Sequence, residues 1–112
     1  MRDDKDLILD IFDAIEAIEK YTSQGKEKYE SDELIQIWVL HHLQIIGEAC
    51  RAISDEIQKK EPSVPWKGII GMRNILVHQY SSVDPDLVWE MVVHDIPVLK
   101  NNIKLLLSKF SS

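Results

Sequence analysis

The chain has 112 residues, of which 45% are hydrophobic and 29% are charged, so it is long enough to form one domain with a buried core. Its formal net charge of −6 argues against a broad basic surface that follows a nucleic-acid backbone, although a small basic pocket is compatible with it. No apolar run reaches the ~20 residues that a membrane span requires, and the acidic start is unlike a signal peptide. A single cysteine, Cys50, excludes an intrachain disulfide. We therefore expect a cytoplasmic protein with a single domain over residues 1–112.

Hydrophobic residues recur at intervals of three and four almost throughout, and the chain has only 4 Gly and 4 Pro. This pattern predicts an all-α fold. We expect a first helix over residues 4–21, in which an apolar stripe faces the core. A polar connection at residues 26–31 then leads to a long second helix over residues 32–60, which has a wide apolar stripe and so should be buried on more than one side.

A third helix is expected over residues 66–80. The fourth has a strong start signal, because Asp84 can cap it and Pro85 suits its first position. It should run to about Val93, and Pro97 is expected to break it and open a fifth helix. Short connections favour antiparallel neighbours, so the sequence predicts an antiparallel helical bundle of about five helices.

Four polar residues lie together on the expected third helix. At about 100° per residue, Arg73 and Tyr80 nearly coincide in direction, and Asn74 and His78 share a neighbouring direction. An arginine fork binds phosphate and a histidine can carry a proton near neutral pH, so this face could hold a phosphodiester and assist proton transfer without a metal. Asn74 could orient the imidazole or bind a base or sugar, and Tyr80 could stack, donate a hydrogen bond or be modified. Gly71, shortly before them, leaves room for another backbone or a ligand.

The same spacing also fits an ordinary ion pair and a satisfied polar histidine, so the four residues alone leave both interpretations open. Elsewhere, the adjacent His41 and His42 cannot face the same way on a helix and lack metal-ligand spacing with any other acidic or histidine cluster. We therefore expect no metal site.

The run Arg73-Asn74-x-x-x-His78-x-Tyr80 resembles the Arg-x4-His-x-Tyr signature of HepT-like toxins, which belong to the HEPN superfamily (higher eukaryotes and prokaryotes nucleotide-binding). The similarity extends to neighbouring segments in the same order: Ile46-Gly47-Glu48-Ala49, Pro65-Trp66, Val83-Asp84, Val88-Trp89 and Asp95-Ile96-Pro97. This resemblance spans nearly the whole chain. It implies a HEPN-like helical bundle that pairs with a second copy, so that two motifs meet in a cleft.

The resemblance also implies a function: a metal-independent endoribonuclease without a cofactor, in which Arg73 and His78 of each protomer are catalytic. The protein would act as a homodimer or a higher oligomer. A ribose 2′-hydroxyl would attack the adjacent phosphate and leave a cyclic phosphate end on the RNA. The protein would be the toxin of a type VII-like toxin–antitoxin pair, silenced by a minimal nucleotidyltransferase antitoxin that transfers AMP to Tyr80. Glu48 would lie near the motif and pair with Arg73 or His78, either to orient it or only as a structural ion pair.

Two other functions stay open. One is a non-catalytic helical module that binds nucleotide or RNA, which the net acidity favours slightly because an RNA-cutting enzyme usually has more positive charge around its groove. The other is a scaffold that accepts AMP from the nucleotidyltransferase. New cyclic-phosphate ends on RNA would distinguish the enzyme from the binding module, and a mass gain at Tyr80 would indicate an acceptor.

Overall fold

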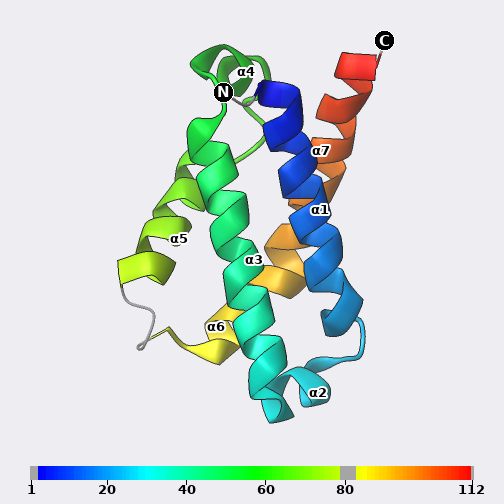
Figure 1. Cartoon of the computed structure of the whole chain (residues 1–112), viewed down its shortest axis with the longest axis vertical. Helices are drawn as coiled ribbons and strands as arrows, with labels where there is room; N and C mark the ends of the chain where they lie inside the picture. The colour runs from blue at the N-terminus through cyan, green and yellow to red at the C-terminus, as the bar shows by residue number, and fades with distance from the viewer. Residues whose placement is uncertain (1–2, 79–82, 112) are drawn as a thin grey trace.

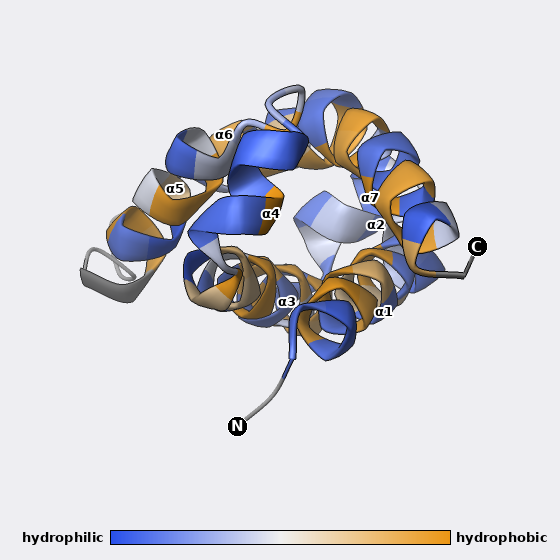
Figure 2. Ribbon diagram, turned by 90° about the horizontal axis from the view of Figure 1, so that it is seen from above, coloured by the Kyte–Doolittle hydropathy of each residue, from blue (hydrophilic) through white to orange (hydrophobic). Residues whose placement is uncertain are grey.

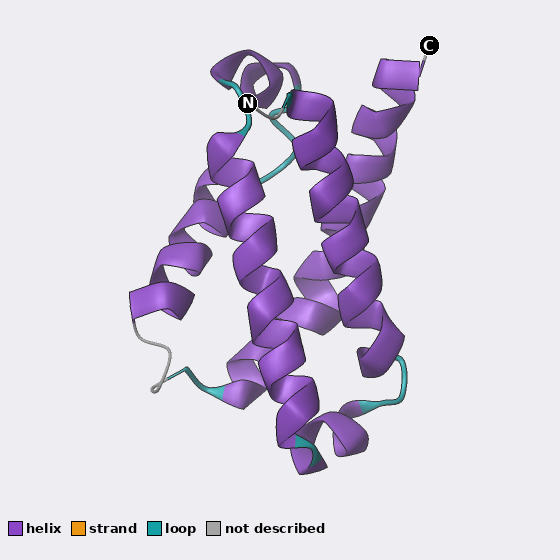
Figure 3. Cartoon of the chain, viewed as in Figure 1, coloured by secondary structure: helices purple, strands orange, loops and turns teal. Residues whose placement is uncertain are grey.

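The computed structural model describes residues 3–111 except for 79–82, and its regular elements are all helices (Figure 3). The expected all-α class is therefore confirmed, and no strand occurs in the described part of the chain. None of the described helices combines the length and hydrophobicity needed to cross a lipid bilayer.

Four long helices form the frame of the molecule: α1 (Asp4–Thr22), α3 (Glu33–Ala52), α5 (Trp66–His78) and α7 (Ile96–Ser111). The colours of Figure 1 show that α1 runs antiparallel to both α3 and α7, and that α5 runs antiparallel to α3. Helix α1 packs against α3 and α7, whereas α5 packs chiefly against α3. Seen along the bundle, α5 lies at its outer edge (Figure 2). The motif helix is therefore held in place mainly by α3.

The apolar stripe predicted for the first helix forms the centre of the core. On α1 its buried members are Leu7, Ile8, Ile11, Ile15 and Ile18. On α3 the buried positions are Ile35, Val39, Leu43, Ile46, Gly47, Ala49 and Cys50. The stripe of α3 is narrower than expected, because Leu34 is 77% exposed and Ile37 is 43% exposed. The side of α3 that carries Leu34 and Ile37 therefore does not pack against the core of the chain.

Residues Lys26–Ser31 form a short helix, α2, instead of the expected polar connection. Gly25 has a φ of 102°, which favours glycine and turns the chain sharply after α1. Tyr29 then points inward: its hydroxyl donates to the Pro85 carbonyl at 2.9 Å, and its ring lies 5.0 Å from that of Trp89. One buried aromatic side chain thus anchors a segment whose composition is otherwise polar.

The single long helix expected over residues 32–60 is two helices, α3 and a short α4 (Asp55–Lys60). Between them Ile53 is extended, with a ψ of 140°, and the hydroxyl of Ser54 caps α4. The Asp4 carboxylate accepts hydrogen bonds from the backbone N–H and the hydroxyl of Ser54, at 2.9 and 2.7 Å. A contact fifty residues away in sequence therefore stabilises a break that helical periodicity does not show.

The predicted start of the fourth helix is confirmed, because Asp84 caps α6 (Pro85–Glu90). The break expected at Pro97 is wrong. The chain passes through a π-helical segment, η2 (Met91–Asp95), directly into α7, so residues 85–111 form one helical run. Proline lacks an N–H and clashes with the carbonyl one α-turn earlier, and the wider π turn accommodates it without ending the helix. In the described part of the chain, the short helices α2 and α4 are added to the helices that the sequence predicts.

Candidate functional site

Arg73 lies where α5 crosses closest to α3. A Cβ atom built on Gly47 of α3 would lie 2.2 Å from the Cβ and 2.8 Å from the Cγ of Arg73, far inside normal contact distance. Only glycine therefore allows the two helices to approach this closely. The side chain of Arg73 is held against α3 and is only 17% exposed.

The guanidinium of Arg73 contacts two further polar side chains. Its Nη2 donates to Oε1 of Glu48 at 2.9 Å, and its Nη1 donates to Oδ1 of Asn74 at 3.1 Å. Of the two partners predicted for Glu48, the structure therefore brings it to Arg73. The Nε of Arg73 is buried and has no partner among the described atoms. Since Glu48 is 60% exposed, its carboxylate can be exchanged for another anion at little cost.

The second half of the motif lies at the end of the described helix. His78 is the last residue of α5, four residues after Asn74, and its backbone is helical. Its side chain, and Tyr80 as a whole, lie outside the described residues. The structure thus brings Arg73, Asn74 and Glu48 together, while the expected roles of His78 and Tyr80 stay predictions.

The room expected at Gly71 is present, and the close approach between two helices of this chain occurs at Gly47. A Cβ on Gly71 would meet no described atom of this chain within 4 Å. Further along α5, Leu76 is buried whereas Ile75 is 53% exposed. The sequence did contain a signal for Gly47, because a glycine within a helix costs roughly 0.5–1 kcal/mol relative to alanine and so indicates a packing requirement.

A separate apolar hollow of about 340 Å³ lies between α3, α5, η2 and α7 and includes Leu43, Met72, Met91 and the carboxylate of Asp95. Arg73, Asn74 and Glu48 are absent from its lining. The polar cluster is instead on the surface where α3 and α5 touch.

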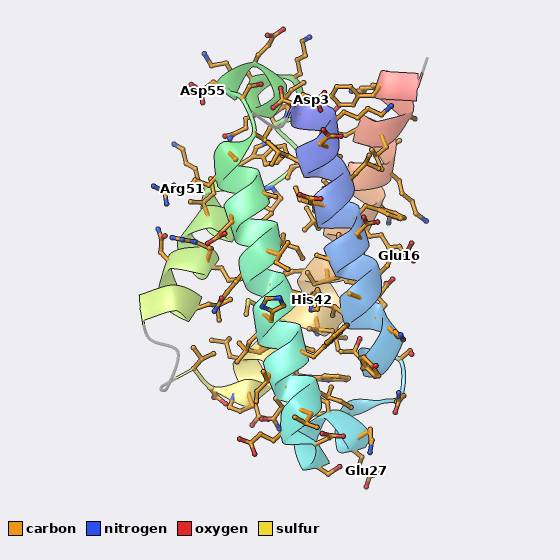
Figure 4. The ribbon with its side chains drawn as sticks, in the orientation of Figure 1. Asp3, Glu16, Glu27, His42, Arg51 and Asp55 are labelled. Atoms are coloured by element: carbon orange, nitrogen blue, oxygen red, sulfur yellow. The ribbon has the colours of Figure 1, made fainter. Side chains whose placement is uncertain are left out.

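The two adjacent histidines of α3 behave as the sequence indicates, because they face different ways. His41 is exposed, whereas His42, labelled in Figure 4, is half-buried with its Nδ1 2.7 Å from the Trp38 carbonyl oxygen. Within the described residues, no three His, Cys, Asp or Glu side chains gather in a group that could hold a metal ion.

A known protein family matches most of the chain, including α3 and α5. The family model "Ribonuclease HepT-like" matches residues 11–106, which include both helices and the whole Arg73–Tyr80 motif. The chain belongs to the HepT-like ribonuclease family. The resemblance of the motif to this family is thereby confirmed over most of the chain.

Several relatives align with the chain over most of its length. A "Putative RNase" of Methanocaldococcus jannaschii is 34% identical over 93% of this chain and 96% of the relative. A "Probable ribonuclease HepT" of Thermococcus cleftensis is 38% identical over 94% and 96%, respectively. A "Putative RNase" of Caldanaerobacter subterraneus subsp. tengcongensis is 35% identical over 82% of both chains. No solved structure matches the chain.

Proposed function

We propose that this HepT-like protein is a metal-independent endoribonuclease in which Arg73 and His78 are the catalytic residues. The observation that carries the proposal is the geometry of Arg73: a cation fixed against Gly47 on the motif helix, whose present partner, Glu48, is an exposed and exchangeable carboxylate. The names of the relatives, which describe ribonucleases, support the same reaction class.

In the proposed reaction, Arg73 binds the non-bridging oxygens of the scissile phosphate, and Glu48 gives way to that phosphate. The ribose 2′-oxygen bonds to phosphorus, the bond from phosphorus to the 5′-oxygen breaks, and the RNA is left with a 2′,3′-cyclic phosphate and a 5′-hydroxyl. His78 transfers the proton, as a base toward the 2′-hydroxyl or as an acid toward the leaving 5′-oxygen. The guanidinium balances the charge that develops on the phosphate, so no metal or cofactor is required.

A homodimer is part of the proposal because one chain offers only one Arg73 and one His78. Two copies that bring their motifs together supply a base and an acid to the same phosphate. Gly71 and Ile75, four residues apart on one face of α5, leave that face available for a second copy, since a Cβ on Gly71 would meet no described atom within 4 Å and Ile75 is 53% exposed.

Tyr80 is proposed as the control point of the enzyme. A minimal nucleotidyltransferase antitoxin would join the tyrosine oxygen to the α-phosphorus of ATP and release pyrophosphate. Tyr80 is seven residues from Arg73 and, in a continued helix, points in nearly the same direction. The added phosphate would compete for the guanidinium and repel the RNA backbone, which would make the pair a toxin and its antitoxin.

The decisive experiment is cleavage of total RNA in EDTA by the purified chain, with detection of new cyclic-phosphate ends. Arg73→Ala and His78→Ala should each lower the rate by about 10²–10⁴-fold while the far-UV circular dichroism stays unchanged. Lys104→Ala, which changes an exposed cation on α7, is the matched control and should cut normally. Cleavage that survives both motif substitutions would disprove the proposal.

The regulatory part has its own test. Co-expression with the antitoxin and ATP should add one or more AMP units to the chain by intact mass, and Tyr80→Phe should block both the mass gain and the silencing. A Tyr80→Phe protein that the antitoxin still silences completely would show that modification occurs elsewhere or is not needed.

One observation favours a second candidate, a non-catalytic nucleotide- or RNA-binding module or an AMP acceptor. Glu48 already neutralises Arg73 in a chain whose net charge is −6. In that case the protein would bind RNA or carry AMP on Tyr80, and no cyclic-phosphate ends would form.

A further inference from the structure

Three cations gather where the α4 end of α3 meets the start of α5, although the chain as a whole is acidic. Arg51 on α3, Lys59 on α4 and Lys67 on α5 are all exposed. None of the three forms an ion pair with any residue that the structure describes. Lys100, by contrast, is neutralised by Glu19 at 2.6 Å. The positive charge at this end of α3 and α5 is therefore available to an external anion.

These cations lie beside the Arg73 site. Lys67 and Asn74 are seven residues apart on α5 and point in nearly the same direction, and Asn74 accepts a hydrogen bond from Arg73. Lys67 thus shares the face of Asn74, ~9 Å before Arg73 along the helix axis. Arg51 is four residues after Gly47, so it lies one turn further along the side of α3 that meets α5. Figure 4 shows Arg51 projecting from α3 on the α5 side.

Lys59 extends this set beyond the end of α5. Lys59 and Lys67 line one open hollow of about 420 Å³ between α4 and the beginning of α5. The amide of Gln58 and the carboxylate of Asp55 line it as well, and Trp66 forms part of its wall. Two cations therefore outnumber one carboxylate there, and both can bind a phosphate oxygen. The Gln58 amide already donates to the carbonyls of Cys50 and Ile53, so the lysines are the donors that face the hollow.

We propose that Arg51, Lys59 and Lys67 form a basic strip that binds the backbone phosphates of single-stranded RNA on one side of the cleavage point. The inference rests on the proposed function, because it extends from the phosphate held at Arg73. A single phosphate cannot lie at Arg73 and Lys67 together, since they are ~9 Å apart along α5. The strip therefore contacts neighbouring phosphates, and it positions the strand without reading its bases.

The net acidity of the chain is consistent with such a strip. Its three cations concentrate the attraction for phosphate at one edge of the site, while the remaining surface repels RNA. The strip is limited in length, because Asp55 and the Lys60–Glu56 pair of α4 lie at its far end. The RNA is thus directed toward the Arg73 site rather than spread over the surface.

The test measures binding of fluorescein-labelled oligouridylate by anisotropy over a range of salt concentrations, in a His78→Ala background so that the RNA is not cut. The strip variant is Arg51→Gln/Lys59→Gln/Lys67→Gln, and its rescue variant is Arg51→Lys/Lys59→Arg/Lys67→Arg. The matched control removes the same charge from exposed lysines of α1 and α7 that have no ion pair in the described part: Lys5→Gln, Lys20→Gln and Lys104→Gln.

The strip variant should bind about tenfold or more weakly, and the slope of log affinity against log salt should become shallower by about 2, since each phosphate contact on a single strand contributes about 0.7. The control and the rescue variant should stay within about twofold of the unaltered background, because the first leaves the strip intact and the second keeps its charge. All substituted side chains are exposed, so the fold should be unaffected.

Equal weakening of the strip and control variants would overturn the strip, because the effect would then be one of net charge. The strip would also be overturned if the His78→Ala protein without further substitutions did not bind oligouridylate. These results are distinguishable from failure of the proposed function: the binding comparison uses uncut RNA, whereas the ribonuclease is tested by the effect of Arg73→Ala and His78→Ala on cleavage.

Discussion

Gly47→Ala is the most informative single substitution in the fold, because it places one methyl group between the two helices that form the site. The new Cβ would lie 2.2 Å from the Cβ, 2.8 Å from the Cγ and 3.3 Å from the Cα of Arg73. Carbon atoms normally approach to about 3.5–4.0 Å, so α3 and α5 have to separate locally by more than ~1 Å. Backbone as well as side-chain atoms of Arg73 are involved, so a rotamer change alone cannot relieve the contact.

The size of the effect follows from two opposing contributions. Overpacking of this kind costs typically about 1–3 kcal/mol. Alanine is the better helix former by about 1 kcal/mol, which offsets part of that cost. We expect a net loss of up to about 2 kcal/mol in the free energy of unfolding, or a fall of up to ~8 °C in Tm for a chain of this length. The loss should be near the upper value, because α5 packs chiefly against α3.

Gly68→Ala is the matched control on α5, since a Cβ there would meet no described atom within 4 Å. It should stabilise the chain by about 0.5–1 kcal/mol. Urea unfolding followed by far-UV circular dichroism would measure both variants, with equal m-values as the check on two-state behaviour. In an Arg73→Gly background most of the cost of Gly47→Ala should disappear, because the Cβ and Cγ it meets are gone. Stabilisation by Gly47→Ala, or an undiminished cost in that background, would refute the reasoning.

Three further predictions concern other parts of the molecule. Ser54→Ala should lower the free energy of unfolding by about 1–2 kcal/mol, because the cap of α4 and the hydrogen bond to Asp4 are lost. A double-mutant cycle with Asp4→Ala, measured by urea unfolding, should show a coupling energy between the two residues, and strictly additive losses would contradict the contact. Burial raises the pKa of the Cys50 thiol to about 12, above its value of 9.0 in the unfolded chain, so its contribution to stability is complete below about pH 9 and is lost as pH rises toward 12. Between about pH 8 and 10, the free energy of unfolding should therefore fall less with rising pH in Cys50→Ala than in the unaltered chain. The same pH dependence of the free energy of unfolding in both proteins would contradict this prediction. Glu48→Ala should lower KM for RNA by about two- to fivefold, because the carboxylate that the substrate phosphate has to displace from Arg73 is gone, and Glu48→Gln, whose amide oxygen still accepts from Arg73 but carries no charge, should lower it less; an unchanged or raised KM in Glu48→Ala would contradict the exchange.

Much of the local structure could be predicted from the sequence because it depends on neighbours in the chain. The stripe of α1 follows from the three- and four-residue spacing of its isoleucines, and the start of α6 follows from Asp84 and Pro85. The placement of Arg73 and Asn74 on one helix follows in the same way. The spacing of residues along one helix determines the direction in which each side chain points. These predictions required only that direction.

Contacts between distant segments had to come from the tertiary structure. Asp4 binds Ser54, 50 residues away, at the break between α3 and α4, although the apolar pattern continues through this break. Tyr29 donates a hydrogen bond to Pro85 and so anchors the polar segment that forms α2. The π segment before Pro97 likewise replaces a break with a continuous helix. In each case a buried or capping contact outweighs the local preference, which amounts to only a few tenths of a kcal/mol per residue.

The candidate site shows the same division. The sequence by itself determined the family motif, its helix and the direction of its polar side chains. Only the tertiary structure decided that Gly47 admits Arg73, that Glu48 and Asn74 bind its guanidinium, and that Lys59 and Lys67 line one hollow. The physical reason is that helical periodicity specifies which way a side chain points, whereas its neighbours depend on how closely two helices pack, and here that closeness depends on the missing Cβ of one glycine.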